Sequence, residues 1–87
     1  MTVQIRVPRR LIKLPRVCDL CALRVTSVYQ QEKAGLLPPR IKLTQRSSAW
    51  VEDEIAAINA ARIAGATNEQ IRRLVADLVA ARAQGAA

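Results

Sequence analysis

The chain has 87 residues, a net charge of +7 and an apolar fraction of 51%, but only 2% of its residues are aromatic and none is phenylalanine. A chain of this length has room for one small domain, which buries about two-thirds of its unfolded surface in a core of Leu, Ile, Val and Ala. No apolar run approaches the roughly 18 residues of a membrane-spanning helix, and the first residues lack a signal-peptide core, so we expect a cytoplasmic protein without membrane contact.

The basic charge is concentrated in the first half of the sequence. Residues 1–50 contain ten Lys and Arg against two acidic residues, a net charge of +8, whereas residues 51–87 contain four Arg against five acidic residues, a net charge of −1. An excess of positive charge on one part of a small chain favours a polyanionic partner, and we expect double-stranded DNA. The alternative is a basic surface that serves only solubility.

Residues 1–13 are predicted to form a basic N-terminal arm. Three aliphatic residues alternate with polar ones before a proline, as in a short strand, and Arg9 and Arg10 follow. These two arginines could reach toward DNA phosphates, although an arm that only keeps the protein soluble explains them equally. The apolar stretch 11–14 is expected to pair with a later hairpin.

Residues 14–66 are predicted to form a winged helix-turn-helix domain that begins with two short helices. Pro15 suits the first turn of the first helix, whose apolar side repeats at helical spacing through Cys21. Leu23 lies in the turn and is expected to fill the angle between the helices. The second helix is predicted from Arg24 to about Lys33.

The outer face of this second helix carries side chains that can read base edges. Val28 is expected to face inward with Tyr29 partly buried, and Gly35 to end the helix in the left-handed conformation. Arginine pairs with guanine, glutamine with adenine, serine and threonine with several bases, and valine with the thymine methyl group. The predicted DNA-binding residues of this helix are Arg24, Val25, Thr26, Ser27 and Gln30. The alternative is an ordinary solvated helix face.

A basic β-hairpin, the wing of the predicted fold, follows. The Pro38-Pro39 pair directs the chain into an extended segment, and residues 40–43 alternate polar and apolar like a half-buried strand. The residues expected to hold the hairpin to the core are Ile41, Leu43 and Trp50. Those predicted to contact phosphates or enter a narrow minor groove are Arg40, Lys42, Gln45 and Arg46. The alternative is charge that protects an exposed sheet edge.

Two C-terminal helices complete the predicted fold class, which is mainly α with a small β-hairpin. Acidic residues 52–54 open the third helix, where they complement the helix dipole. Thr67 and Gln70 resemble a capping box before an amphipathic stripe from Ile71 to Val79. Residues 67–87 are therefore predicted to form a separate amphipathic helix with frayed last four residues, and it either completes the core or docks on a neighbouring copy.

Cys18 and Cys21 form a C-x-x-C motif for which no chemistry is expected. A zinc site needs four ligands, and the chain has no histidine and no third cysteine. Two small core residues of a reduced protein explain the pair. We predict no catalytic residue, no metal and no cofactor, because there is no nucleophile paired with a base and no carboxylate pair outside residues 52–54.

Short motifs follow one another between Leu14 and Ile55. They are Leu14-Pro15-Arg16-Val17, Ala22-Leu23-Arg24, Thr26-Ser27-Val28-Tyr29, Gly35-Leu36-Leu37-Pro38, Ile41-Lys42-Leu43, Arg46-Ser47-Ser48-Ala49-Trp50 and Glu54-Ile55. In this order the set resembles the AlpA-type regulators and small excisionases, whose winged-helix domain is similar to that of the MerR superfamily. The chain departs from the family pattern where Ala22 replaces a turn glycine, Arg24 a cap serine and Thr44 a wing-tip glycine.

The resemblance implies a bacterial, nucleoid-associated protein of a mobile element. It would act as an excisionase, also called a recombination directionality factor, which bends attachment-site DNA so that an integrase excises the element. Such bending predicts cooperative self-association on DNA. The resemblance equally permits a transcription regulator of integrase or excision genes. A third hypothesis, a protein-interaction module that uses the stripe from Ile71 to Val79, predicts no DNA binding.

Overall fold

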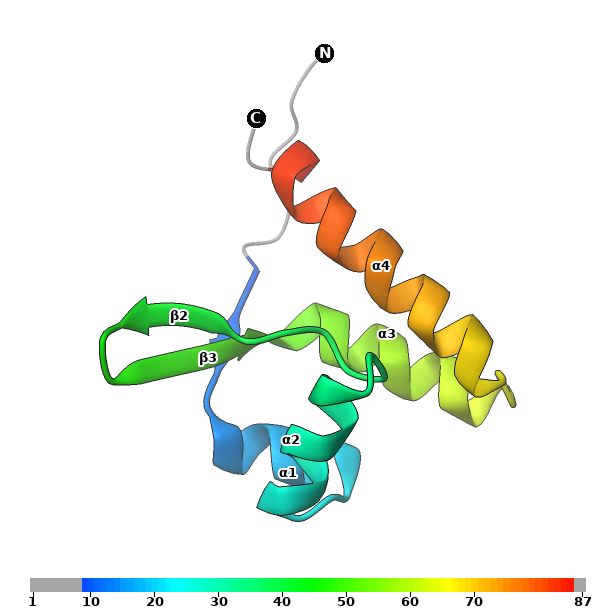
Figure 1. The fold of residues 1–87 in the computed structure, drawn as a ribbon, viewed down its shortest axis with the longest axis horizontal. Coiled ribbons are helices and arrows are strands. Elements are labelled where there is room, and N and C mark those ends of the chain that lie inside the picture. The colour runs from blue at the N-terminus through cyan, green and yellow to red at the C-terminus, as the bar shows by residue number, and fades with distance from the viewer. Residues whose placement is uncertain (1–8, 86–87) are drawn as a thin grey trace.

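Within the described residues, four helices pack at one end of a small antiparallel sheet, and its β-hairpin projects away from them (Figure 1). The computed structural model describes residues 9–85. The elements are β1 (Leu11–Ile12), α1 (Leu14–Cys21), α2 (Val25–Lys33), β2 (Ile41–Thr44), β3 (Ser47–Val51), α3 (Glu52–Ile63) and α4 (Asn68–Gly85). The predicted fold class, a winged helix-turn-helix followed by two helices, is confirmed. The strand expected within residues 1–8 lies outside the described residues.

Helices α1 and α2 form the helix-turn-helix unit. Pro15 lies in the first turn of α1, and Val17 and Val28 are completely buried where the two helices meet. The α1 helix ends at Cys21, and its C-cap Ala22 has a φ of 56°, in the left-handed region that favours glycine. The N–H of Leu23 donates to the Cys18 carbonyl (3.0 Å), so the turn keeps its helix-ending hydrogen bond although alanine occupies the strained position.

The α2 helix ends as the sequence predicts. Gly35 follows the last turn with a φ of 80°, a conformation that side chains disfavour. The next N–H, that of Leu36, donates to the Gln31 carbonyl (2.8 Å) and closes the helix end. Leu36 and Leu37 are then buried, so the chain passes through the core before it reaches the wing.

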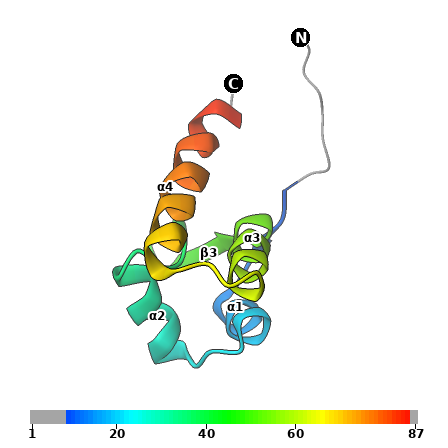
Figure 2. The same cartoon turned by 90° about the vertical axis from the view of Figure 1, so that its right-hand side faces the viewer.

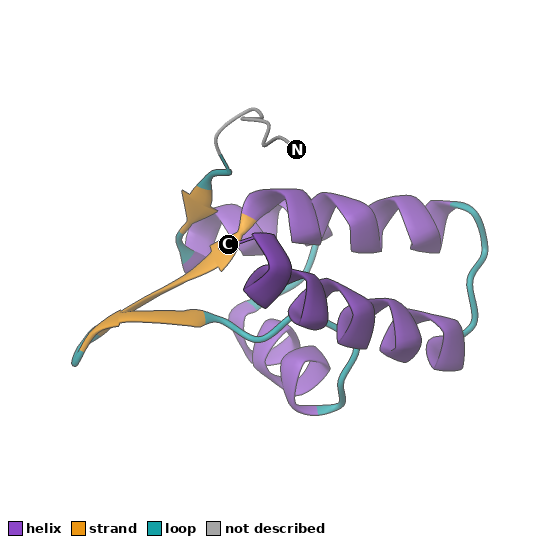
Figure 3. Ribbon diagram, turned by 90° about the horizontal axis from the view of Figure 1, so that it is seen from above, coloured by secondary structure: helices purple, strands orange, loops and turns teal. Residues whose placement is uncertain are grey.

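The sheet has the order β1-β3-β2, and both pairings are antiparallel. Ile12 lies opposite Trp50, which confirms that the apolar stretch 11–14 pairs with the hairpin. The β2–β3 pairing becomes irregular beyond Lys42, and Gln45 and Arg46 form the turn. Trp50 is 1% exposed, whereas Leu43 is 44% exposed, so the expectation that Leu43 holds the hairpin to the core is wrong. The hairpin extends beyond the helices (Figure 3), and only its root is covered.

Helix α4 packs against α3 and contributes to the same core (Figure 2). Thr67 N–H donates to Gln70 Oε1 (2.8 Å) and Gln70 N–H donates to Thr67 Oγ1 (3.1 Å), which confirms the capping box. Ile71 and Val75 are buried in the core, so most of the amphipathic stripe is used within the chain. The helix extends to Gly85, which is longer than expected, and residues 86–87 lie outside the described part.

The core draws on every helix and on two strands. Its buried members are Ile12, Val17, Val28, Leu36, Leu37, Trp50, Ile55, Ile58, Ile71 and Val75. Among residues 9–85, none of the helices combines the length and the apolar character needed to cross a bilayer.

The left-handed Ala22 gives a stability prediction. An L-residue in this conformation costs roughly 1–2 kcal/mol, and glycine avoids that cost while losing roughly 0.5–1 kcal/mol more through chain entropy. We therefore expect Ala22→Gly to raise the free energy of unfolding by about 0.5–1 kcal/mol in urea titrations followed by circular dichroism. The control is Ala60→Gly at an exposed position in α3, which should destabilise by about 1 kcal/mol. Equal destabilisation by both changes would contradict the account of the turn.

Candidate nucleic-acid interface

A groove lined by four cations lies between the start of α1, one side of α2 and the wing. Its volume is about 470 Å³, and none of its lining residues is acidic. The lining residues of this basic groove are Lys13, Leu14, Pro15, Tyr29, Arg40, Lys42, Gln45, Arg46, Ser47, Ser48 and Trp50. A concave surface with cations and hydroxyl groups but no carboxylates suits the phosphate groups of a nucleic acid.

The structure brings all four predicted wing residues into the basic groove. Arg40, Lys42, Gln45 and Arg46 are exposed and line it together. Lys42 lies opposite Ser48 in the β2–β3 pairing, while Gln45 and Arg46 come from the turn. The hairpin therefore gathers charges that the sequence places only near one another.

The predicted residues of α2 lie beside the basic groove rather than in its lining. Arg24 is the N-cap of α2, and its backbone is extended. Val25 is 48% exposed, Thr26 and Gln30 are also exposed, and Ser27 is half-buried. This part of α2 thus offers polar groups and one exposed valine to a ligand that reaches past the groove.

Tyr29 and Arg40 connect α2 with the wing. The Arg40 guanidinium lies 5.0 Å from the centre of the Tyr29 ring, in cation–π geometry. The Tyr29 ring lies 6.4 Å from that of Trp50, at an interplanar angle of 47°. Tyr29 is 40% exposed, which is more than the partial burial expected from the sequence. The Tyr29 and Trp50 rings therefore connect α2 with the wing at the basic groove.

Lys13 is a member of the basic groove that the sequence did not indicate. Its ammonium group donates to the hydroxyl of Ser47 and to the carbonyl of Ser48 (3.4 Å). A single lysine within an apolar stretch carries no signal of its own. Only the pairing of β1 with β3 brings it beside the wing, since 34 residues separate it from Ser47.

The predicted arm residues are not brought to the basic groove. Arg9 donates to both carboxylate oxygens of Asp53 (2.9 and 3.0 Å) and lies 3.4 Å from Glu54 Oε2. The hydrogen bond from Arg9 lowers the pKa of Asp53 below its ordinary value. Arg10 lies 3.8 Å from Glu52 and is largely exposed. Contact of Arg9 with phosphates would require it to leave these carboxylates, and its role in DNA binding stays a prediction.

The environment of Glu54 shows that the helix dipole alone does not explain acidic residues 52–54. The helix dipole accounts for exposed acids in a first turn, but Glu54 is completely buried and its carboxylate bonds to Arg82 of α4 (2.6 and 2.9 Å). Glu54 and Arg82 therefore form a buried ion pair that joins α3 to α4.

The cysteines remain free thiols packed against the core. Burial raises the pKa of the Cys21 thiol, so it stays protonated at neutral pH and is a poor nucleophile and metal ligand. Within the part of the chain that the structure describes, no three His, Cys, Asp or Glu side chains form a metal-binding group.

Comparison with known proteins gives the family. The chain is 36% identical over 56 residues to the uncharacterized protein ORF88 of Enterobacteria phage P4, in an alignment that covers 64% of each chain. It thus spans slightly less than two-thirds of that relative's length. No solved structure matches the chain. Residues 10–62 match the family model described as prophage CP4-57 regulatory protein (AlpA). This range contains α1, α2 and the wing, and the chain belongs to the AlpA family.

Proposed function

We propose that this protein is an excisionase, or recombination directionality factor, of a mobile element. Membership in the AlpA family implies a DNA-binding regulatory role. The observation that carries the proposal is the basic groove, which combines Lys13 just before α1 with three cations of the wing and its root and has no acidic lining residue. In this proposal the protein binds attachment-site DNA and bends it, so that an integrase assembles for excision.

The proposed docking places the start of α2 in the major groove of the duplex. The first residues of the second helix read base edges in helix-turn-helix proteins. Arg24, Val25, Thr26 and Ser27 lie at the start of α2 here, and Gln30 lies farther along the helix. Lys42, Gln45 and Arg46 of the wing then contact the adjoining backbone, with Lys13 beside them. Arg40 contributes at the wing root, where its charge is shared with Glu32 (3.3 Å).

Bending also has an energetic requirement. Deforming a short duplex by 40–90° costs on the order of 1–6 kcal/mol, which several bound copies meet more readily than one small domain. Cooperative self-association on DNA and contact with an integrase therefore belong to this proposal.

A second candidate is a transcription regulator of integrase or excision genes. The family's description as a regulatory protein favours it. The two candidates share the DNA-binding surface and differ in what the bound protein changes.

The proposed roles of α2 in base recognition and of the wing in backbone contact can be tested by substitution. We expect Arg24→Ala or Gln30→Ala to lower the preference for the target sequence by roughly 1–3 kcal/mol per lost base contact. Lys42→Ala or Arg46→Ala should weaken binding to all duplexes alike, and should reduce the slope of log affinity against log salt by about one. Fluorescence anisotropy with target and scrambled duplexes at several salt concentrations measures both effects. If the two pairs of variants behave alike, the proposed docking is wrong.

Excision with purified components separates the two candidate functions. On a supercoiled plasmid that carries both attachment sites, the cognate integrase should excise efficiently only when this protein is added. A Lys42→Ala, Arg46→Ala double variant should fail to stimulate, because it lacks the wing contacts. Excision that is equally efficient without the protein, together with altered transcript levels after deletion of its gene, would favour the transcription regulator.

A further inference from the structure

We infer that the peptide unit between Pro39 and Arg40 is a clamped joint that fixes the wing relative to α2, with Glu32 and Arg82 as its positioning residues. The inference rests on the proposed DNA binding, because the joint matters only if α2 and the wing contact the same duplex. Neither Glu32 nor Arg82 lines the basic groove.

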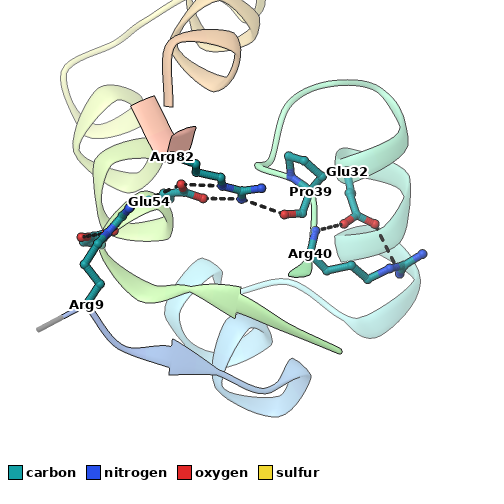
Figure 4. Close-up of polar contacts among 7 residues, drawn as sticks. Arg9, Glu32, Pro39, Arg40, Glu54 and Arg82 are labelled. Carbon is teal, nitrogen blue, oxygen red and sulfur yellow. Dashed lines mark hydrogen bonds and ion pairs between the residues drawn. The ribbon is translucent and has the colours of Figure 1, made fainter. Parts of the chain in front are cut away.

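Two side chains hold the two polar groups of this one peptide unit (Figure 4). The Pro39 carbonyl accepts a hydrogen bond from Arg82 Nη2 of α4 (2.9 Å). The Arg40 N–H donates to Glu32 Oε2 of α2 (2.6 Å), and the Arg40 guanidinium lies 3.3 Å from the other oxygen of the same carboxylate. Because β2 begins at the next residue, Ile41, a rotation of this peptide plane would swing the wing.

The chain offers no other backbone donor at this point. Pro38 and Pro39 have no N–H group, so the Arg40 N–H is the first donor after Leu37. Residues 38–40 also lie outside the sheet. At the wing root, side chains of α2 and α4 therefore hold the backbone in place, as inter-strand hydrogen bonds do farther along the hairpin.

Glu54 holds Arg82 in place for this task. Its completely buried carboxylate accepts hydrogen bonds from Arg82 Nη2 (2.6 Å) and Nε (2.9 Å). These bonds raise the pKa of Arg82, which keeps its charge at all relevant pH values. A buried carboxylate needs its partner, so the guanidinium is fixed beside α3 with an N–H directed at Pro39. Helix α4 thus contributes to the wing as well as to the core.

The direction in which a Glu32 substitution changes DNA affinity distinguishes a clamp from a purely electrostatic effect of the carboxylate. Removing an acidic residue near a basic groove strengthens DNA binding if charge alone matters. The clamp predicts the opposite, because a released wing loses its orientation relative to α2. We expect Glu32→Ala to weaken binding to an attachment-site duplex by about tenfold, the order of one well-formed contact. Glu32→Gln retains an acceptor for the Arg40 N–H and should bind at least as tightly as wild type.

Arg82→Met should weaken binding by a similar factor, whereas Arg73→Met, which removes an exposed charge from the same helix, should have little effect. Combining Glu32→Ala with Arg82→Met should weaken binding by much less than the product of the single effects, since either change already frees the peptide unit. Independent effects that multiply, or tighter binding by Glu32→Ala, would overturn the inference.

Arg82→Met leaves Glu54 buried without its Arg82 partner and lowers stability, so a second variant is needed. Replacing both members of a buried ion pair by apolar residues is often neutral for stability. Glu54→Leu combined with Arg82→Met should therefore fold cooperatively and still bind DNA about tenfold more weakly. Binding of this folded double variant at wild-type strength would also overturn the inference.

Hydrogen exchange in the free protein tests the joint without DNA. In Glu32→Ala the amides of β2 and β3 should exchange several-fold faster, while those of the turn between α1 and α2 keep their wild-type rates. In the wild type at low urea, wing amides should open together with those of the last turns of α4. Unchanged wing exchange in Glu32→Ala, or independent opening of the wing and α4, would refute the clamp. If the wild type binds no duplex but the wing amides exchange faster in Glu32→Ala as expected, the proposed function is wrong and the clamped joint is retained.

Discussion

Strand β3 is the constraint on which the arrangement of the molecule depends. It pairs with β1 on one side and with β2 on the other, and α3 begins at the residue after it. Its Trp50 is 1% exposed and contacts the Tyr29 ring of α2. Removing a buried tryptophan costs about 3–5 kcal/mol, a large share of the stability of a small domain. The same strand therefore supports the core and directs the wing toward the side of α2.

The parts of the fold that local chemistry determines could be predicted from the sequence. Pro15 marks a helix start, Gly35 a helix end, and Thr67 and Gln70 cap each other across three residues. Contacts between distant residues could not be predicted, because no spacing rule connects Glu54 with Arg82 or Lys13 with Ser47. The expectation for Leu43 failed because strand alternation gives the face of a side chain but not how far the covering helices extend.

The candidate interface also has features that could be predicted from the sequence and features that could not. The exposed charges of the wing were predictable, because β-hairpins are recognised from alternation and turns. Lys42 and Arg46 lie on the hairpin, and Arg40 lies directly before it. Their arrangement with Lys13 and Tyr29 required the tertiary structure. AlpA family membership implies a regulatory DNA-binding role, and the basic groove is the surface that we propose for it. The two proposed functions, excision and transcription control, would both use this surface, and they would differ in the proteins that act on the bound DNA.

The most direct measurement is a titration of the ¹⁵N-labelled protein with an attachment-site duplex, followed by amide chemical shifts at moderate salt. If α2 lies in the major groove and the wing on the adjoining backbone, the largest changes will occur from Arg24 to Gln30, from Lys42 to Ser48 and at Lys13. Changes concentrated on the exposed faces of α3 and α4, with the basic groove unaffected, would contradict the account.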